Sequence, residues 1–201
     1  MGSKGKATKN KIVQSARRLL RMKGYANTSI EEICTESGVK RGNLYFHFKS
    51  KEELACAAVD DAAERNFPFF EAFMQDETDP LRRIELMVDG IMSYYEARGS
   101  KASCLFGNIA QEVGDSNRVL AEAVHRFFAA WIDLLSGLFE EAKTLGLVDK
   151  DLDGEAFGHL IVSSLEGILI IHKASHDPAA YTKTRKALKE LLAGLRVANQ
   201  G

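Results

Sequence analysis

The residues with the greatest capacity for chemistry lie in one stretch, residues 28–51 (TSIEEICTESGVKRGNLYFHFKSK). Helical spacing of its apolar residues predicts two short helices joined by a tight turn at Gly38. The outward face of the second helix would carry polar, basic and aromatic side chains, namely Lys40, Arg41, Asn43, Phe46 and His47. Arginine and asparagine can each form two hydrogen bonds with a base edge, and such a helix fits the major groove of duplex DNA. The pattern therefore predicts a DNA-reading helix.

The other residues of this stretch fit the same interpretation. Ile30, Ile33, Leu44 and Phe48 would bury the face that the two helices share, with Val39 in the angle between them. Gly42 has no side chain, so the start of the second helix can approach bases closely. Thr28 stands three residues before Glu31, which is capping-box spacing, and backbone N–H groups at that helix start can donate to a phosphate.

The segment GVKRGNLYFHFKSKEEL resembles the DNA-binding signature of the TetR family of bacterial repressors. The matching positions are Val39, Gly42, Leu44, Tyr45, His47, Phe48 and Lys51, and the resemblance covers about residues 8–55. It implies phosphate contacts from Thr28, Tyr45, His47 and Lys51. It implies base or close-backbone contacts from Arg41, Gly42 and Asn43.

Two positions depart from the family pattern. Lys40 stands where the family usually has Ser or Thr, so a helix cap is lost and a phosphate-seeking charge is gained. Phe46 replaces a more common polar or tyrosine residue, and it offers contact with a thymine methyl instead of a hydrogen bond. An alternative interpretation places Tyr45, His47 and Phe48 in an aromatic core that the lysines solvate, and we expect this role for Phe48 and Leu44.

The charge distribution supports a polyanionic partner. The whole chain has a formal net charge of -1. Residues 1–51 hold 12 Lys/Arg and three Asp/Glu, a net charge of +9, so the remaining residues carry -10. A cationic head on an anionic body indicates that the head meets a polyanion, although a solvated basic surface would look the same.

The fold class follows from helical periodicity along almost all of the 201 residues. We expect an all-α protein of about nine helices, with a three-helix DNA-binding domain (residues 1–51) and a larger ligand-binding and dimerisation domain (residues 52–201). Thr8 is expected to cap the first helix, and Pro68 to kink or break the fourth. The longest strictly apolar run, residues 127–132, is too short to cross a membrane, and no usual secretory signal is present, which predicts a cytoplasmic protein.

The body of the chain is rich in methionine and aromatic side chains at helical spacing. The resemblance implies that such residues line a pocket for a small apolar, aromatic or electrophilic inducer, with Met87, Ile91, Tyr95, Cys104, Asn108, Phe127, Phe128, Trp131 and Glu166 as candidates. Plain hydrophobic core is the alternative for each of them. Cys104 is expected near a helix start, where a thiolate is favoured, and it is either an electrophile sensor or a small buried hydrophobe. Glu166 fits a polar pocket anchor or an interface hydrogen bonder.

The last two helices resemble the pair through which the family dimerises. Leu165, Leu169, Leu188 and Leu192 are the candidates for that interface, and intramolecular core is the alternative. A homodimer would present two reading helices to successive turns of a palindromic operator.

The sequence contains no motif of the common hydrolases, phosphate-loop enzymes or zinc proteases, and its three cysteines lack metal-type spacing. We therefore expect no catalytic residues, metal or cofactor. The predicted function is a ligand-responsive transcriptional regulator that represses as a homodimer. An architectural DNA-binding protein without an effector is the second hypothesis, and an enzyme is the third.

Overall fold

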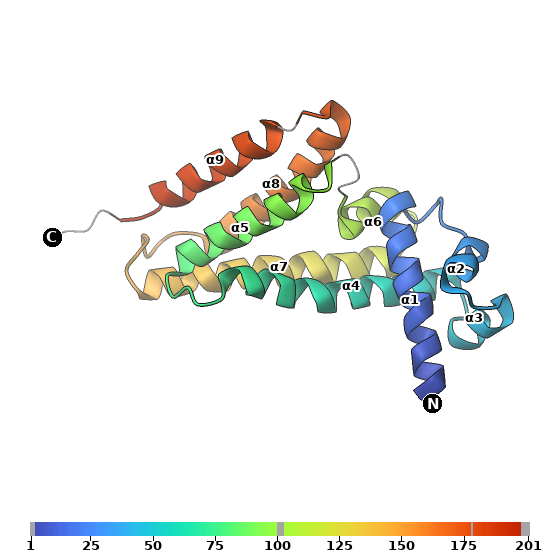
Figure 1. Ribbon diagram of the computed structural model, residues 1–201. Coiled ribbons are helices and arrows are strands. Elements are labelled where there is room, and N and C mark those ends of the chain that lie inside the picture. The colour runs from blue at the N-terminus through green and yellow to red at the C-terminus, as the bar shows by residue number, and fades with distance from the viewer. Residues whose placement is uncertain (1–2, 100–102, 178, 198–201) are drawn as a thin grey trace. The chain divides into compact units, whose positions relative to one another are not determined.

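The computed structural model describes residues 3–99, 103–177 and 179–197 (Figure 1). Within those ranges the chain forms nine helices and no strand, apart from one isolated antiparallel bridge between Val148 and Arg196, so the all-α prediction is confirmed. The helices are α1 (Ser3–Lys23), α2 (Ile30–Ser37), α3 (Arg41–His47), α4 (Lys51–Met74), α5 (Pro80–Glu96), α6 (Leu105–Val113), α7 (Arg118–Thr144), α8 (Gly154–Ser175) and α9 (Ala179–Gly194).

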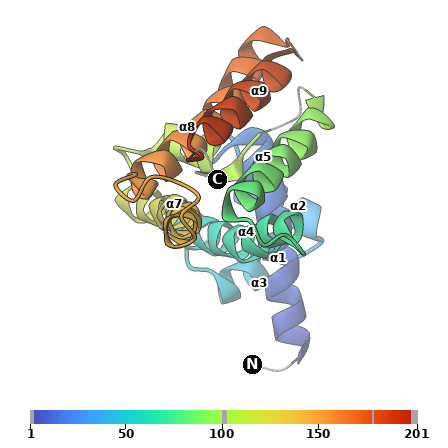
Figure 2. The same ribbon diagram turned by 90° about the vertical axis from the view of Figure 1, so that its left-hand side faces the viewer.

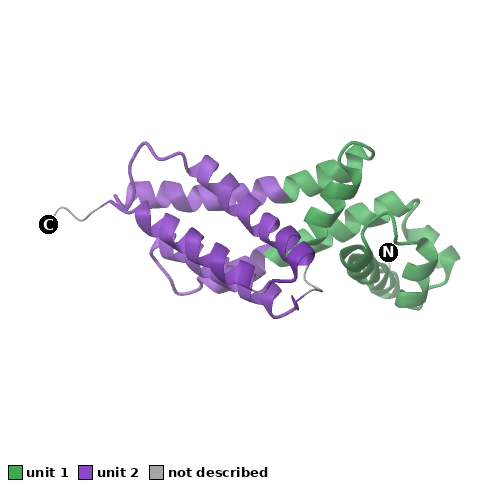
Figure 3. Ribbon diagram, turned by 90° about the horizontal axis from the view of Figure 1, so that it is seen from above, with its two compact units in different colours: residues 1–66, 103–127 green, residues 67–102, 128–201 purple. Residues whose placement is uncertain are grey.

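The chain divides into two compact units (Figure 3). The first comprises residues 1–66 and 103–127, so it holds α1–α3, most of α4, α6 and the start of α7. Helix α1 contacts α2, α3 and α6. The core of this unit is apolar and almost fully excluded from solvent, and it includes Ile12, Ala16, Leu20, Ile33, Leu44 and Phe48. The expected domain boundary at residue 51 stays a prediction, since the compact unit extends beyond it.

The second unit comprises residues 67–102 and 128–201, with α5, α8, α9 and the remaining parts of α4 and α7. Helix α5 contacts both α8 and α9. Ion pairs join α9 to α5, since Lys189 Nζ lies 2.8 Å from Asp89 Oδ2 and Arg185 lies 3.0 Å from Glu96. A Cβ atom on Gly90 would lie 2.3 Å from the Phe73 ring, so glycine permits α4 and α5 to pack closely.

Two expected helix features differ in the structure. Helix α1 begins at Ser3, and the Thr8 hydroxyl donates to the Lys4 carbonyl at 3.0 Å inside the helix, so Thr8 is not its cap. Helix α4 runs on through Pro68, so the proline does not break it, and a kink at Pro68, the other expected outcome, stays a prediction. At the start of α4, Ser50 Oγ accepts from the Glu53 amide at 3.0 Å, so Ser50 caps this helix.

Candidate DNA-binding interface

Helix α2 is secured at both ends. Its N-cap is Ser29, whose Oγ accepts from the Glu32 amide at 3.2 Å, while the Glu32 carboxylate accepts from the Ser29 amide at 2.9 Å. This reciprocal pair is a capping box. At the other end Gly38 adopts φ 67°, a left-handed conformation that glycine tolerates best, and its amide donates to the carbonyls of Cys34 and Thr35. The start of α2 is therefore one residue later than the sequence spacing predicted.

Thr28 has a different role from the one expected. Its hydroxyl donates to the Gly24 carbonyl at 2.7 Å, its amide donates to Tyr25 at 3.3 Å, and the residue is only 1% exposed. Both donors of Thr28 are thus engaged inside the chain. The cap assigned to Thr28 was wrong, and the structure gives no support to the phosphate contact that the resemblance implied for it.

The N-terminus of helix α3 lacks the side-chain hydrogen bond that caps α2. Its N-cap, Lys40, makes no side-chain cap hydrogen bond, which confirms the loss of the cap predicted for this position. The amides of Asn43 and Leu44 donate to the Lys40 carbonyl at 2.9 and 3.1 Å. Leu44 and Phe48 are buried, as expected, and they hold α3 to the rest of the unit.

The opposite face of α3 is open to solvent. Lys40, Arg41, Gly42 and Asn43 are exposed, and Phe46 is 71% exposed although it is fully apolar. Tyr45 and His47 are half-buried, and the His47 ring meets the Phe46 ring edge-on at 5.2 Å between centroids. A Cβ atom on Gly42 would meet nothing within 4 Å. Packing of this chain therefore does not require glycine at position 42, and the open space suits close approach of an outside molecule.

Arg41 is held by neighbours of its own unit. Its Nη1 donates to the Glu31 carboxylate, and its guanidinium lies over the Tyr45 ring, 5.6 Å from the centroid. A hydrogen bond with Tyr45, followed by the attraction of Glu31, raises the pKa of Arg41 above its ordinary value. The arginine therefore keeps its charge, and in this structure its partners are Glu31 and Tyr45.

Lys51 lies against the turn between α1 and α2. Its Nζ is 4.4 Å from the centroid of the Tyr25 ring and donates to the Ala26 carbonyl at 3.4 Å. Desolvation lowers the pKa of Lys51 below its ordinary value, although Glu112 acts in the opposite direction. The resemblance implies a phosphate contact from Lys51, and in this structure the Lys51 ammonium already has a cation–π partner, the Tyr25 ring.

The sequence did not reveal that α6 secures the end of α1. Within the first unit, Ser103 Oγ and Asn108 Nδ2 both donate to the Arg21 carbonyl, at 2.9 and 3.1 Å. The Glu112 carboxylate accepts from the Ala26 amide at 2.7 Å. These bonds span more than 80 residues of chain, so no local spacing could have predicted them. Asn108, an expected pocket residue, therefore has a partner on α1.

The other expected pocket residues fall in both compact units. In the first unit Cys104 is the N-cap of α6 and is buried, and the Phe127 ring stacks on Phe106 at 3.5 Å. In the second unit Trp131 is buried and stacks on Phe70 at 4.8 Å. Also in the second unit are two buried residues, Met87 and Ile91, and three half-buried ones, Tyr95, Phe128 and Glu166.

The four leucines expected at a dimer interface are buried within the single chain. Leu165, Leu169, Leu188 and Leu192 are 1–6% exposed, and α8 contacts α9. Intramolecular core, the alternative that the sequence also allowed, describes them. The apolar residues that α8 exposes are Leu160, Ile170 and Ile171, at 45–57%. Helix α8 is also long and apolar enough to cross a membrane, by length and composition alone.

Comparison with known proteins decides the family. The family model for bacterial regulatory proteins of the tetR family matches residues 12–58, and the model for the tetracyclin repressor-like C-terminal domain matches residues 80–188. The chain belongs to the TetR family. TetR-family proteins are transcriptional regulators with a helix-turn-helix DNA-binding domain, which is the part of this chain that α2 and α3 form.

Three similar regulators cover between 62% and 98% of this chain. An HTH-type transcriptional regulator from the lacX 3' region of Lactococcus lactis is 28% identical over 173 residues, 85% of each chain. The regulator LmrA of Bacillus subtilis is 30% identical over 125 residues, 62% of this chain and 66% of its own. The crystal structure of a TetR regulator from Chloroflexus aurantiacus, 27% identical, covers 98% of this chain and 100% of its own with a TM-score of 0.89.

Proposed function

We propose that this TetR-family regulator is a homodimeric repressor that reads a palindromic operator through α3 and is released by a small molecule. The observation that carries the proposal is the exposed face of α3. Arg41 and Asn43 can form paired hydrogen bonds with base edges, and Phe46 offers an apolar surface to a thymine methyl. Among the described residues, none places an atom within 4 Å of a Cβ on Gly42, so the backbone of α3 can approach DNA closely.

Repression is favoured by the match to the tetracyclin repressor-like domain. A regulator of this kind acts by occupying DNA, which places the protein in the cytoplasm. We propose phosphate contacts from Lys40, Tyr45, His47 and Lys51, and base contacts from Arg41, Asn43 and Phe46. Arg41 exchanges its contact with Glu31 for a base, so its net contribution to binding is the free energy gained at the neutral base edge minus that lost at the Glu31 carboxylate.

The proposed dimer uses the outer face of α8. Leu160, Ile170 and Ile171 are exposed large apolar residues on one helix whose other face is buried. A second copy of the chain covers such a face, and Gly167, where a Cβ would meet nothing within 4 Å, permits close approach of a partner helix. The apolar character of α8 is then explained by association between chains and needs no membrane.

The proposed inducer is a small apolar, aromatic or electrophilic molecule. The second unit contains a rich set of aromatic contacts, including the stacked pair of Phe70 and Trp131. Such side chains bind flat apolar ligands well. Cys104 is buried at the N-cap of α6, a position in which the helix dipole favours a thiolate, so an electrophile is the specific alternative to reversible binding.

Operator binding is the first test. The wild-type protein should retard duplex DNA from upstream of its own gene more strongly than random DNA of equal length. Arg41→Ala should weaken operator binding by about 1–3 kcal/mol and reduce the preference over random DNA. Lys183→Gln, an exposed lysine of the second unit, serves as the charge control and should bind normally. A wild-type protein without preference for any selected duplex contradicts the proposal.

The inducer hypothesis has a separate test, which distinguishes it from an architectural DNA-binding role. A thermal-shift screen of aromatic and electrophilic compounds should give compounds that raise the melting temperature and release DNA in the same concentration range. A protein with no effector should give none. Full alkylation of Cys104 with unchanged operator affinity would rule out the electrophile sensor and leave reversible binding.

A further inference from the structure

A run of lysines precedes the part of α1 that the family model matches. The match begins at residue 12, whereas α1 begins at Ser3. The nine helical residues in between carry Lys4, Lys6, Lys9 and Lys11, and no acidic residue. All four lysines are exposed.

These charges do not serve the stability of α1. The positive end of the helix dipole lies at the N-terminus, where acidic side chains stabilise a helix and basic ones destabilise it. The first turn of α1 contains no acidic residue. Gly5, close to Lys4 and Lys6, is also a poor helix former. The lysines near the N-terminus and Gly5 both disfavour the helix, so an anionic partner outside the chain is a better explanation for this segment.

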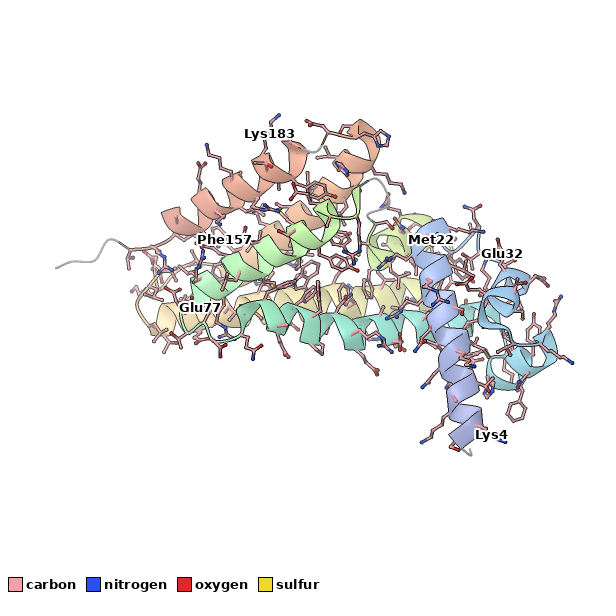
Figure 4. The ribbon with its side chains drawn as sticks, in the orientation of Figure 1. Lys4, Met22, Glu32, Glu77, Phe157 and Lys183 are labelled. Atoms are coloured by element: carbon pink, nitrogen blue, oxygen red, sulfur yellow. The ribbon has the colours of Figure 1, made fainter. Side chains whose placement is uncertain are left out.

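The lysine segment lies beside the C-terminal end of α3, the helix whose other face is proposed to read DNA. Lys9 Nζ lies 5.4 Å from the centroid of the Phe48 ring, and Phe48 is the C-cap of α3. Figures 1 and 2 both show the first turns of α1 extending past α3. Lys4 lies at the far tip of this extension (Figure 4). A duplex seated on α3 would therefore continue along the lysine segment.

We propose that Lys4, Lys6, Lys9 and Lys11 form a second DNA-binding surface, which contacts phosphates outside the base pairs that α3 reads. This inference rests on the proposed function. Lysine is a compact charge on a flexible stem, so it suits phosphate oxygens and carries little sequence information. Lys4 and Lys11 share one side of the helix, seven residues apart, and Lys6 and Lys9 are one turn apart. The two pairs lie on opposite sides of the helix, so about two simultaneous phosphate contacts with one duplex are expected.

Salt dependence measures these contacts directly. Each phosphate contact contributes about 0.9 to the slope of log K against log salt concentration. The variant with Lys4, Lys6, Lys9 and Lys11 all changed to Gln should lose about 1.8 from that slope on a duplex with long flanks, which corresponds to two phosphate contacts. Its preference for the operator over random DNA should be unchanged. On a duplex trimmed to the base pairs read by α3, the variant and the wild type should have equal slopes.

A matched control separates local contacts from total charge. Lys150, Lys173, Lys183 and Lys186 are exposed lysines of the second unit, and changing all four to Gln alters the net charge equally. This control should keep the wild-type slope. A third variant retains Lys9, and thus its contact with Phe48, and changes Lys4, Lys6 and Lys11 to Gln. It should still lose at least about 0.9 from the slope.

The outcomes are distinguishable. If the lysine variants keep the wild-type slope on the long duplex, or if the control loses as much, the inference is wrong while operator binding stands. If the wild-type protein itself prefers no duplex, the proposed function fails. Duplex DNA selected by the wild-type protein from a random pool is the probe in every arm.

Discussion

The two helices of the helix-turn-helix differ in how they are secured. Helix α2 has a capping box between Ser29 and Glu32 and a left-handed glycine at its end. Helix α3 has no side-chain cap and contains Gly42. Helix α2 thus satisfies its own terminal groups, while α3 depends on the burial of Leu44 and Phe48 and leaves its other face to solvent. The difference indicates that α2 stabilises the fold of this unit, whereas α3 leaves one face available for binding another molecule.

Among the changes that test the contrast between α2 and α3, the largest expected effect comes from closing the open space at Gly42. Gly42→Ala should reduce operator affinity about tenfold, which corresponds to about 1.4 kcal/mol, because the new methyl group lies where DNA approaches. The same change should raise the free energy of unfolding by up to about 0.5 kcal/mol, since alanine favours a helix and its Cβ meets no atom of the described residues within 4 Å. Fluorescence anisotropy and urea denaturation measure the two quantities. Equal affinities would show that position 42 lies away from DNA.

Changing the N-cap residue of each helix to alanine sharpens the contrast between α2 and α3. Ser29→Ala should lower the free energy of unfolding by about 1 kcal/mol, because the Glu32 amide loses its acceptor. Lys40→Ala, the matched change at the uncapped helix, should alter stability by less than about 0.5 kcal/mol but weaken DNA binding. Urea denaturation and hydrogen exchange of residues 28–48 provide the measurements. A comparable loss of stability in both variants would remove the distinction.

The smallest effect concerns pH. The Lys23 ammonium, followed by hydrogen bonds from Ser29, lowers the pKa of Glu32 from 4.5 to about 2. A depressed carboxyl pKa adds stability that is complete above about pH 4.5 and is lost as the pH falls through about 2. The melting temperature should therefore fall on acidification in this range, and less steeply in Glu32→Gln. Glu155→Gln, an exposed control on α8, should follow the wild type, and parallel curves for all three proteins would argue against this role of Glu32.

The sequence predicted what local pattern determines. Periodicity located nine helices, and the burial of Leu44 and Phe48 together with the uncapped Lys40 followed from residue types within one turn. Thr28 and Ser29 both fit the capping-box spacing, with Glu31 and Glu32 respectively. The Thr28 hydroxyl donates to the Gly24 carbonyl, so it is not available as a cap, and Ser29 is the N-cap of α2. Local spacing does not contain that information.

Contacts between distant segments could not be predicted. Glu112 reaches the Ala26 amide across 86 residues, and only the packing of α6 against α1 brings them together. Likewise, the apolar stripes of α8 and α9 show that Leu165 and Leu188 are covered, but periodicity does not say whether the covering helix belongs to the same chain. In the structure the covering helix is in the same chain, and the apolar residues left exposed on α8 are others.

The uncapped start of α3 has a consequence for protein engineering. Replacing Lys40 with serine would supply the missing cap and add up to about 1 kcal/mol of stability, while removing a cation from the surface that we propose to face DNA. A laboratory selection for heat resistance alone would favour that replacement and would erode operator occupancy. Serine at position 40 would therefore favour folding stability at the expense of DNA affinity, and the lysine found here favours DNA affinity at the expense of folding stability.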